Sequence, residues 1–192
     1  MATGGKKQRR ADEAAKKKTA RKIKLTGWAI ALALAAAAGV AYYNDRADLP
    51  GQKIESLGRT HISQNSPTPS YNSVPPTSGA HSGATRWGYH QAEIPEINQV
   101  HNLEHGGILI QYNCDRLGPE TSCAQLLGAL RPVFDKARRE VHKKIILAPY
   151  SKLERPIALT AWTWLQYLDE VDEAAILTFA DRHINNAPEN VP

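Results

Sequence analysis

The chain has 192 residues, of which 42% are hydrophobic and 22% charged, the composition of one globular domain with room for a tail. Its net charge of +5 is uneven, because residues 1–24 carry ten Lys and Arg against two acids, whereas the chain beyond residue 43 carries 14 basic and 17 acidic side chains. The basic character therefore belongs to the tail and argues against nucleic-acid binding by the main domain. Two cysteines exclude a disulfide-framework miniprotein and a four-cysteine zinc site.

Residues 25–43 contain no charged side chain and are rich in Ala and Leu. As a helix they span about 28 Å, close to the thickness of the hydrocarbon core of a bilayer. We predict a single transmembrane helix with the basic tail, residues 1–24, in the cytoplasm, because positive residues flank membrane helices on that side. A buried Ala-rich helix and a cleaved signal peptide are the alternatives. The remaining chain is then extracytoplasmic and held at the plasma membrane.

Residues 44–56 are predicted to be a tether, and residues 57–189 an extracytoplasmic domain. The chain up to residue 96 is rich in Pro, Gly, Ser and Asn, which predicts a long ordered loop region with one short strand at residues 57–62. The β-branched run at residues 108–112 follows two glycines and predicts a strand.

A capping box at Ser122 and Gln125 precedes apolar residues at helical spacing up to Val141, with a kink or a break expected at Pro132. Strands are predicted at residues 144–150 and 156–165, the second with two Trp side chains on one face, and a helix capped by Asp169 at residues 170–186. This order predicts an α+β fold in which a small sheet of about three to five strands packs against two helices.

Cys114 and Cys123 enclose a loop that contains Gly and Pro. Eight residues separate them, against two in thioredoxin-like redox pairs, so we expect a structural disulfide in an oxidising compartment. Free thiols and metal thiolates are the alternatives.

Five of the seven histidines fall within 45 residues: His61, His81, His90, His101 and His105. The spacing of His101, Glu104 and His105 is that of inverted zinc peptidases. A helix brings the two rings to about 6 Å, whereas a strand separates them by about 13 Å. Gly106 and the strand after it leave space for about two helical turns only, which disfavours a peptidase.

We predict a metal site formed by His81, His101, His105 and Glu104, with Glu104 as a ligand or, more in keeping with its position, as a group that orients a ring. The prolines and glycine before His81 predict a stiff turn that fixes its position. Imidazole ligands suit Zn²⁺ or Cu²⁺, and the lack of any Met after Met1 argues against a thioether Cu⁺ site.

Four blocks of the sequence resemble the signature blocks of a bacterial family called domain of unknown function 3105, which often follows one N-terminal membrane segment. The blocks are NSVPPTSGAHSGATRWGYH, VHNLEHGGILIQYNC, PIALTAWTW and RHINNAPE, and they cover residues 57–189 in order. The resemblance implies an extracytoplasmic α+β domain and a single site, but no reaction. The motif positions are Pro75, Pro76, Ser78, Gly79, His81, Trp87, Gly88, His101, Asn102, Glu104, His105 and Gly106.

The sequence therefore favours a membrane-anchored extracytoplasmic domain that binds Zn or Cu through histidines. One alternative is a non-enzymatic envelope module that binds a protein partner or has a structural role, with its histidines in structural hydrogen bonds. The other is a metal-dependent hydrolase, in which a metal-bound water or a His–Glu pair is the base. No catalytic residue is predicted. The expected partners are the membrane and a protein of unknown identity, and not nucleic acid.

Overall fold

The computed structural model describes residues 24, 27–40, 42, 49–189 and 191. Its contacts divide the chain into two compact units, Met1–Asp48 and Leu49–Pro192. In the first unit residues 27–40 form a helix whose apolar side chains are exposed, Trp28 and Leu32 among them. None of the helices in the described parts of the chain combines the length and apolar character that a membrane crossing requires. The predicted tail, and residues 25, 26, 41 and 43 of the predicted span, lie outside the described residues.

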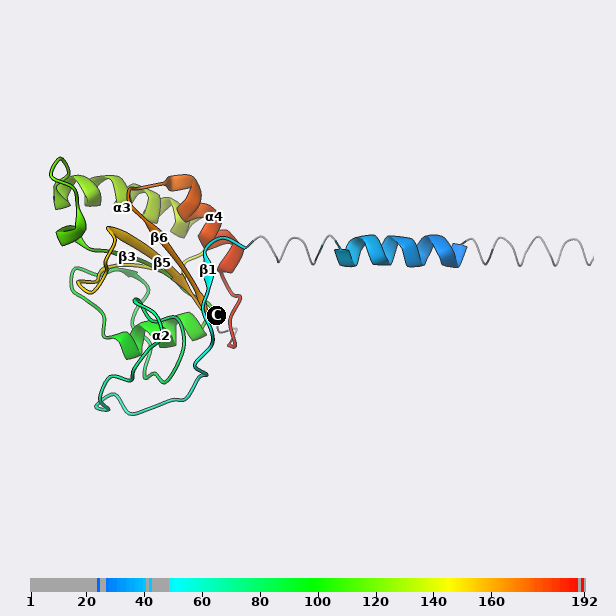
Figure 1. Ribbon diagram of the computed structural model, residues 1–192, viewed down its shortest axis with the longest axis horizontal. Coiled ribbons are helices and arrows are strands. Elements are labelled where there is room, and N and C mark those ends of the chain that lie inside the picture. The colour runs from blue at the N-terminus through cyan, green and yellow to red at the C-terminus, as the bar shows by residue number, and fades with distance from the viewer. Residues whose placement is uncertain (1–23, 25–26, 41, 43–48, 190, 192) are drawn as a thin grey trace, which may run out of the picture. The chain divides into compact units, whose positions relative to one another are not determined.

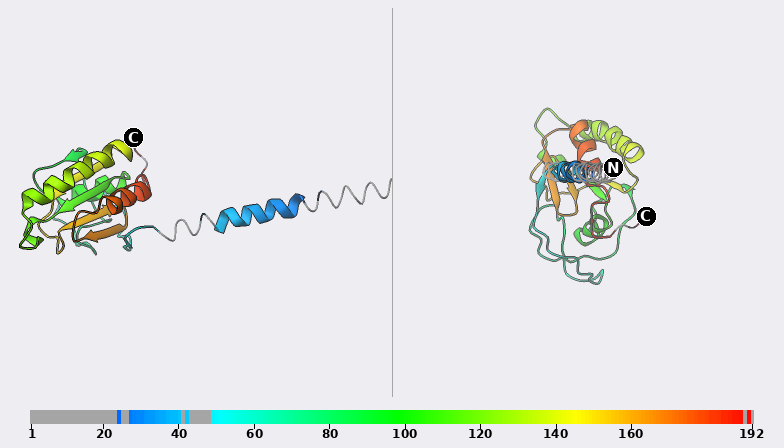
Figure 2. Two further views of the ribbon diagram at one scale, coloured as in Figure 1. Left: turned by 90° about the horizontal axis from the view of Figure 1, so that it is seen from above. Right: turned by 90° about the vertical axis from the view of Figure 1, so that its right-hand side faces the viewer.

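Six strands of the second unit form one mixed sheet in the order β1-β6-β5-β3-β4-β2 (Figures 1 and 2). β3 pairs in parallel with β4 and antiparallel with β5, β5 pairs antiparallel with β6, and the edge strands β1 and β2 complete the sheet. The strands are β1 (Gln52–Lys53), β2 (Gly88–Tyr89), β3 (Ile108–Tyr112), β4 (Ile145–Pro149), β5 (Ile157–Ala161) and β6 (Trp164–Leu168).

The α+β class is confirmed, but the sheet has more strands than the three to five expected. β3 to β5 are nearly continuous apolar runs because both of their faces are covered. β1 and β2 are two residues each, too short to give a periodic signal. The strand expected at residues 57–62 does not form, and only His61 makes an isolated bridge, to His81.

Helices α3 (Cys123–Glu140) and α4 (Glu173–His183) cover one face of the sheet. The predicted capping box is confirmed: Ser122 accepts from the Gln125 amide, and the Gln125 side chain accepts from the Ser122 amide. Pro132 lies within one uninterrupted helix rather than at a junction of two. α4 begins later than expected, because Asp172 rather than Asp169 is its N-cap.

The opposite face of the sheet is covered by α2 (Glu96–Glu104) and by the long loop region (Figure 1). The expectation of two helices is therefore incomplete. The residues of β3 alternate between the faces, since Ile108 and Ile110 pack beneath α3 and α4, and Leu109 packs toward α2. Gln111 also faces α2, where its amide donates to the side chain of Gln99.

The single strand expected at residues 156–165 is a hairpin of β5 and β6. Trp162 and Thr163 form its turn, and Thr163 takes a positive φ of 62°. The turn reverses the chain between the two tryptophans. Trp162 therefore packs toward the α2 face and Trp164 toward the α3 face, which makes the prediction of a shared face wrong.

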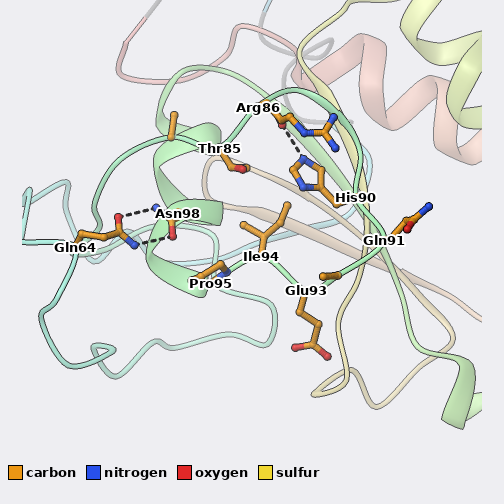
Figure 3. Close-up of a pocket in the computed structure, with 11 residues that line it drawn as sticks. Gln64, Thr85, Arg86, His90, Gln91, Glu93, Ile94, Pro95 and Asn98 are labelled. Carbon is orange, nitrogen blue, oxygen red and sulfur yellow. Dashed lines mark hydrogen bonds between the residues drawn. The ribbon is translucent and has the colours of Figure 1, made fainter.

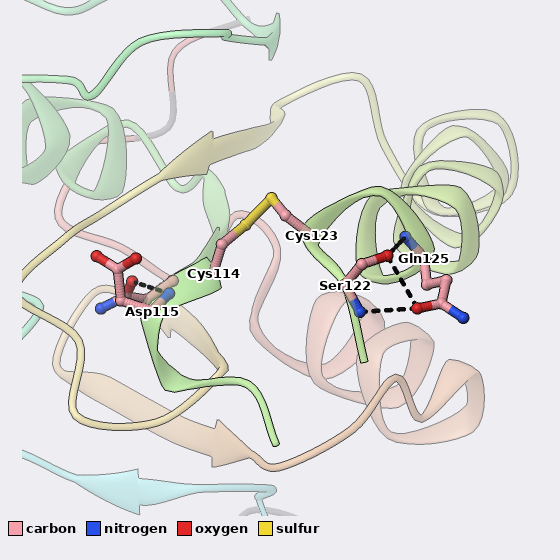
Figure 4. Close-up of a disulfide and its surroundings, with 6 residues drawn as sticks. Cys114, Asp115, Ser122, Cys123 and Gln125 are labelled. Atoms are coloured by element: carbon pink, nitrogen blue, oxygen red, sulfur yellow. Dashed lines mark hydrogen bonds between the residues drawn. A yellow bond between two sulfur atoms is a disulfide. The ribbon is translucent and has the colours of Figure 1, made fainter. Parts of the chain in front are cut away.

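A disulfide joins Cys114, in the short 3-10 helix η1 (Cys114–Arg116), to Cys123 at the start of α3 (Figure 4). Both cysteines of the chain are thus paired, as predicted. The bond ties the end of β3 to the helix that covers the apolar face of the sheet.

Candidate metal centre

Four side chains come together on the α2 face of the sheet: His61, His81, His101 and Glu104. Each offers one ligand atom, and these atoms all lie within 4.8 Å of one another. His61 and His81 come from two segments of the loop region, whereas His101 and Glu104 come from α2.

The two loop histidines are placed side by side by main-chain hydrogen bonds. The amide of Ile62 donates to the carbonyl of His81 at 2.8 Å, and the amide of His81 donates to the carbonyl of Thr60 at 3.0 Å. A third bond joins the amide of Gly79 to the carbonyl of Gly58. The segments therefore run parallel at this point, which aligns residues that are 20 positions apart in the sequence.

The turn before His81 is tightly enclosed. Gly79 has a φ of +121°, and a Cβ there would lie 3.2 Å from the ring of Tyr71. The Tyr71 hydroxyl donates to the carbonyl of Ala80, and the Ser78 hydroxyl accepts from the amide of Leu57. Because Pro75 and Pro76 are also buried, the His81 backbone is held from several directions.

α2 presents His101 and Glu104 on one face, because residues three apart in a helix are neighbours. The side chain of Asn102 both donates to and accepts from the backbone of Thr85, which attaches the helix to the loop region. The helix ends because Gly106 takes a φ of +77°, and a Cβ at this position would lie 2.7 Å from Asn185. Two and a half turns of helix are thus enough to direct both side chains to the loop histidines.

The contacts within the group converge on one carboxylate oxygen. Oε2 of Glu104 lies 2.8 Å from Nε2 of His81 and 3.3 Å from Nε2 of His61. The other ring nitrogen of His81, Nδ1, lies 2.8 Å from the carbonyl of Gly79, to which it donates because a carbonyl can only accept. This bond turns Nε2 toward Glu104, in the manner of the partners that orient metal-binding histidines.

Two buried polar atoms of the group have no hydrogen-bond partner, Nδ1 of His101 and Oε1 of Glu104. Burial lowers the pKa of His101 below its usual 6.5, and repulsion from His105, His81 and His61 lowers it further against the opposing effect of Glu104. The imidazole of His101 is therefore neutral at pH 7, with a lone pair free to bind a cation.

The group is buried on one side and open on the other. The side chains of His81 and Glu104 are fully buried, whereas that of His61 is 54% exposed. The ring of Trp162, at the hairpin turn of β5 and β6, packs perpendicular to the ring of His81. Solvent therefore reaches the site past His61.

Three of the four residues predicted for the site, His81, His101 and Glu104, lie in this group. The fourth, His105, packs its ring 4.4 Å from that of His101 but lies outside the group, and its Nε2 pairs with Glu189 at 3.4 Å. His61 was not among the predicted ligands, because no motif surrounds it in the sequence. Its only signal was membership of the histidine-rich stretch.

A polar cavity of about 510 Å³ is lined by the loop region and by Pro95 and Asn98 at the start of α2 (Figure 3). Gln64 and Asn98 face each other there through two amide hydrogen bonds, and the ring of His90 bonds the Arg86 carbonyl. None of the four clustered residues lines this cavity. It is therefore separate from the histidine group.

Comparison with known proteins gives one match. No curated protein and no solved structure matches the chain significantly. A family model described as "Protein of unknown function (DUF3105)" matches residues 61–192, a range that begins at His61 and contains all four clustered residues. Because this match covers more than half of the chain, the protein belongs to the DUF3105 family.

Proposed function

We propose that this domain binds one Zn²⁺ or Cu²⁺ ion through His61, His81, His101 and Glu104. The observation that carries the proposal is the contact between His81 and Glu104. With Nδ1 donating to the Gly79 carbonyl, a neutral His81 turns the lone pair of Nε2 toward a carboxylate oxygen 2.8 Å away. Two such lone pairs repel each other unless a cation, either a proton or a metal ion, lies between them.

A second imidazole favours the metal ion over the proton. A single proton satisfies one contact, whereas Glu104 is approached by both His81 and His61, and His101 contributes another buried nitrogen without a partner. In a tetrahedral zinc site with bonds of about 2.0–2.2 Å the ligand atoms are about 3.3–3.6 Å apart. The separation of His61 Nε2 and Glu104 Oε2 is 3.3 Å, whereas that of His81 Nε2 and Glu104 Oε2 is 2.8 Å, the length of a hydrogen bond.

The donor set selects the ion. Three imidazoles and one carboxylate suit Zn²⁺ and Cu²⁺, and they do not suit the hard ions Ca²⁺ and Mg²⁺, which take oxygen ligands. Cys114 and Cys123 are paired with each other, so neither contributes a thiolate.

The competing role is structural. Hydrogen bonds between His81, His61 and Glu104 would join two loop segments to α2 without any metal. This role is favoured by the number of main-chain bonds that already hold residues 58–62 against residues 79–81. A hydrolase is less favoured, because Glu104 lies among the ligand atoms and is not free to act as a base.

The test is metal content. The full chain, purified from an oxidising compartment, is equilibrated with Zn²⁺ or Cu²⁺ in turn, desalted and measured by mass spectrometry for bound metal. We expect one ion per chain. The nearly isosteric Glu104→Gln variant removes a charged ligand and should lower the metal affinity at least tenfold.

His90→Ala is the matched control, because His90 is a loop histidine outside the group and should leave the stoichiometry unchanged. A structural role gives the opposite pattern, in which the wild-type chain binds no ion and Glu104→Gln changes only the melting temperature.

We also propose that residues 25–43 anchor this domain on the extracytoplasmic side of the plasma membrane. Three features support this topology: the uncharged stretch with its basic leader, the exposed apolar side chains at residues 27–40, and a disulfide suited to an oxidising compartment. Protease added to intact spheroplasts should degrade the domain and spare a cytoplasmic marker. Protection of the domain would contradict the topology.

A further inference from the structure

We propose that the site exchanges its metal ion with chelating partners, and that His61 is the ligand that leaves to let the ion pass. This inference rests on the proposed function, because it requires that an ion is bound. It goes further by assigning the site to metal transfer rather than to permanent structural binding, and by naming the side on which transfer occurs.

The first observation is the asymmetry of exposure. The side chains of His81 and Glu104 are fully buried, whereas that of His61 is 54% exposed. The chain around His61 is exposed as well, since every residue from 55 to 61 is exposed. An incoming chelator therefore meets His61 before it meets the other ligands.

The second observation is the asymmetry of anchoring. Glu104 and His101 belong to α2, which packs against the sheet and is bonded to the loop region through Asn102. His81 is fixed by its ring bond to Gly79 and is covered by Trp162. Among the described residues, the contacts found for the His61 ring are an ion-pair contact with Glu104 and packing against the rings of His81 and His101, and all three of these residues are proposed ligands.

These asymmetries give the ligands different costs of release. Moving His81 or Glu104 away from an ion breaks hydrogen bonds and leaves buried polar groups unpaired, which is strongly unfavourable. His61 breaks its bond to the ion and leaves two ring contacts, but it buries no unpaired polar group when its half-exposed side chain rotates into solvent.

When His61 rotates away, three protein ligands keep the ion and one coordination position faces solvent. An open position is what separates reactive zinc sites from closed structural ones. A partner that offers an imidazole, carboxylate or other chelating donor can then bind to the ion before the protein releases it. Transfer of this kind is associative, so its rate depends on the concentration of the acceptor.

The experiment uses the full chain loaded with whichever of Zn²⁺ and Cu²⁺ binds at one ion per chain. The ion is transferred to the chromogenic chelator 4-(2-pyridylazo)resorcinol, and the rate is followed by absorbance at several chelator concentrations. We expect the wild-type rate to rise in proportion to the chelator concentration. His61→Ala should release the ion at least tenfold faster and keep the circular dichroism spectrum and melting temperature of the wild-type apoprotein.

His90→Ala again serves as the matched control and should release the ion at the wild-type rate. A wild-type rate that does not depend on chelator concentration would overturn the exchange role, because the ion would then leave only after the protein opens. Equal release from His61→Ala and the wild-type chain would also overturn it. Either result leaves the metal site itself in place, whereas failure to load one ion per chain would overturn both proposals.

Discussion

The two faces of the sheet are built from different interactions. Beneath α3 and α4 lies one large cluster of hydrophobic side chains from the strands and both helices. Beneath α2 and the loop region the hydrophobic clusters are small, and many of the fully buried side chains are polar. They include Thr77, Ser78, His81, Gln99, Asn102, Glu104 and Gln111.

The difference separates what stabilises the domain from what positions the site. Burial of apolar surface is nondirectional and stabilises in proportion to area, so the α3 face can tolerate changes of shape. Hydrogen bonds are directional. When one partner is lost, the buried donor or acceptor that remains is unpaired, and this costs a large free energy. The α2 face therefore fixes the ligand atoms at defined positions, whereas the α3 face supplies most of the stability.

The largest effect is expected on the hydrophobic face. Phe179 of α4 is fully buried in the large cluster, and Phe179→Ala should lower the free energy of unfolding by about 3–5 kcal/mol, since a large cavity remains. Urea unfolding measures this loss. The variant should still bind one ion per folded chain. Loss of metal binding with little loss of stability would contradict the assignment of stability to the α3 face and of the ligand positions to the α2 face.

The hydrophobic face was also the one that the sequence predicted well. The strand at residues 108–112 and the capping box at Ser122 were identified correctly, because their signals are local and periodic. The hairpin at Trp162 was missed, because a turn with a positive φ at Thr163 carries no Gly, Asn or Pro signal.

The α2 face was harder to predict for a physical reason. Its structure depends on hydrogen bonds between residues far apart in the sequence, such as the pairing of His61 with His81 and of Asn102 with Thr85. The helical spacing of His101 and Glu104 was recognisable, but nothing local indicated that His61 joins them rather than His105. The proximity of His61 to His101 and Glu104 arises only in the folded chain, and no periodic pattern in the sequence predicts it.

The next largest effect concerns the disulfide, which lies on the α3 side of the sheet. Replacing both Cys114 and Cys123 by Ser releases a ten-residue loop and should lower the free energy of unfolding by about 3 kcal/mol in the chain-entropy model. Urea unfolding gives the value, and metal affinity should not change because neither cysteine belongs to the histidine group. A variant with weaker metal binding would show that the two faces are coupled.

A smaller effect is expected at the end of α2. A Cβ on Gly107 would lie 2.4 Å from the ring of Trp87 and 2.9 Å from the carbonyl of Asn102. Gly107→Ala should therefore lower the free energy of unfolding by about 1–3 kcal/mol through overpacking. It should also weaken metal binding, because the strain falls on the helix that carries His101 and Glu104. Isothermal titration calorimetry with the ion that the wild-type chain binds measures this loss of metal affinity.

Gly128→Ala is the matched control for that substitution, since Gly128 is an exposed position inside α3 with open space around it. It should raise the free energy of unfolding by about 0.5–1 kcal/mol, because Ala favours the helix, and leave metal affinity unchanged. Equal metal affinity in the two variants would contradict the prediction that strain at the end of α2 reaches His101 and Glu104.

The smallest effect is a dependence on pH that arises at His183, near the hydrophobic cluster and away from the site. The ring is almost fully buried against Phe179 and Trp164, and its Nε2 donates to the carbonyl of Pro50 at 2.8 Å. Burial lowers the pKa of His183 below 6.5, because the second ring nitrogen would have to carry a proton with no partner. The unfolded chain therefore binds more protons than the folded one as the pH falls below 6.5. The contribution of His183 to stability is complete above that pH and decreases as the pH falls toward the folded-state pKa, with a slope of at most about 1.4 kcal/mol per pH unit.

Urea unfolding of the metal-free chain between about pH 5 and pH 8 should show this decrease, and His183→Asn should be less stable at neutral pH but have a flatter profile. His101 and His142 also have lowered pKa values and remain in both proteins, so the difference between the two profiles isolates His183. If the stability of the wild type and of His183→Asn depended on pH in the same way, His183 would accept its second proton in the folded state without cost. Water would then reach this part of the hydrophobic face.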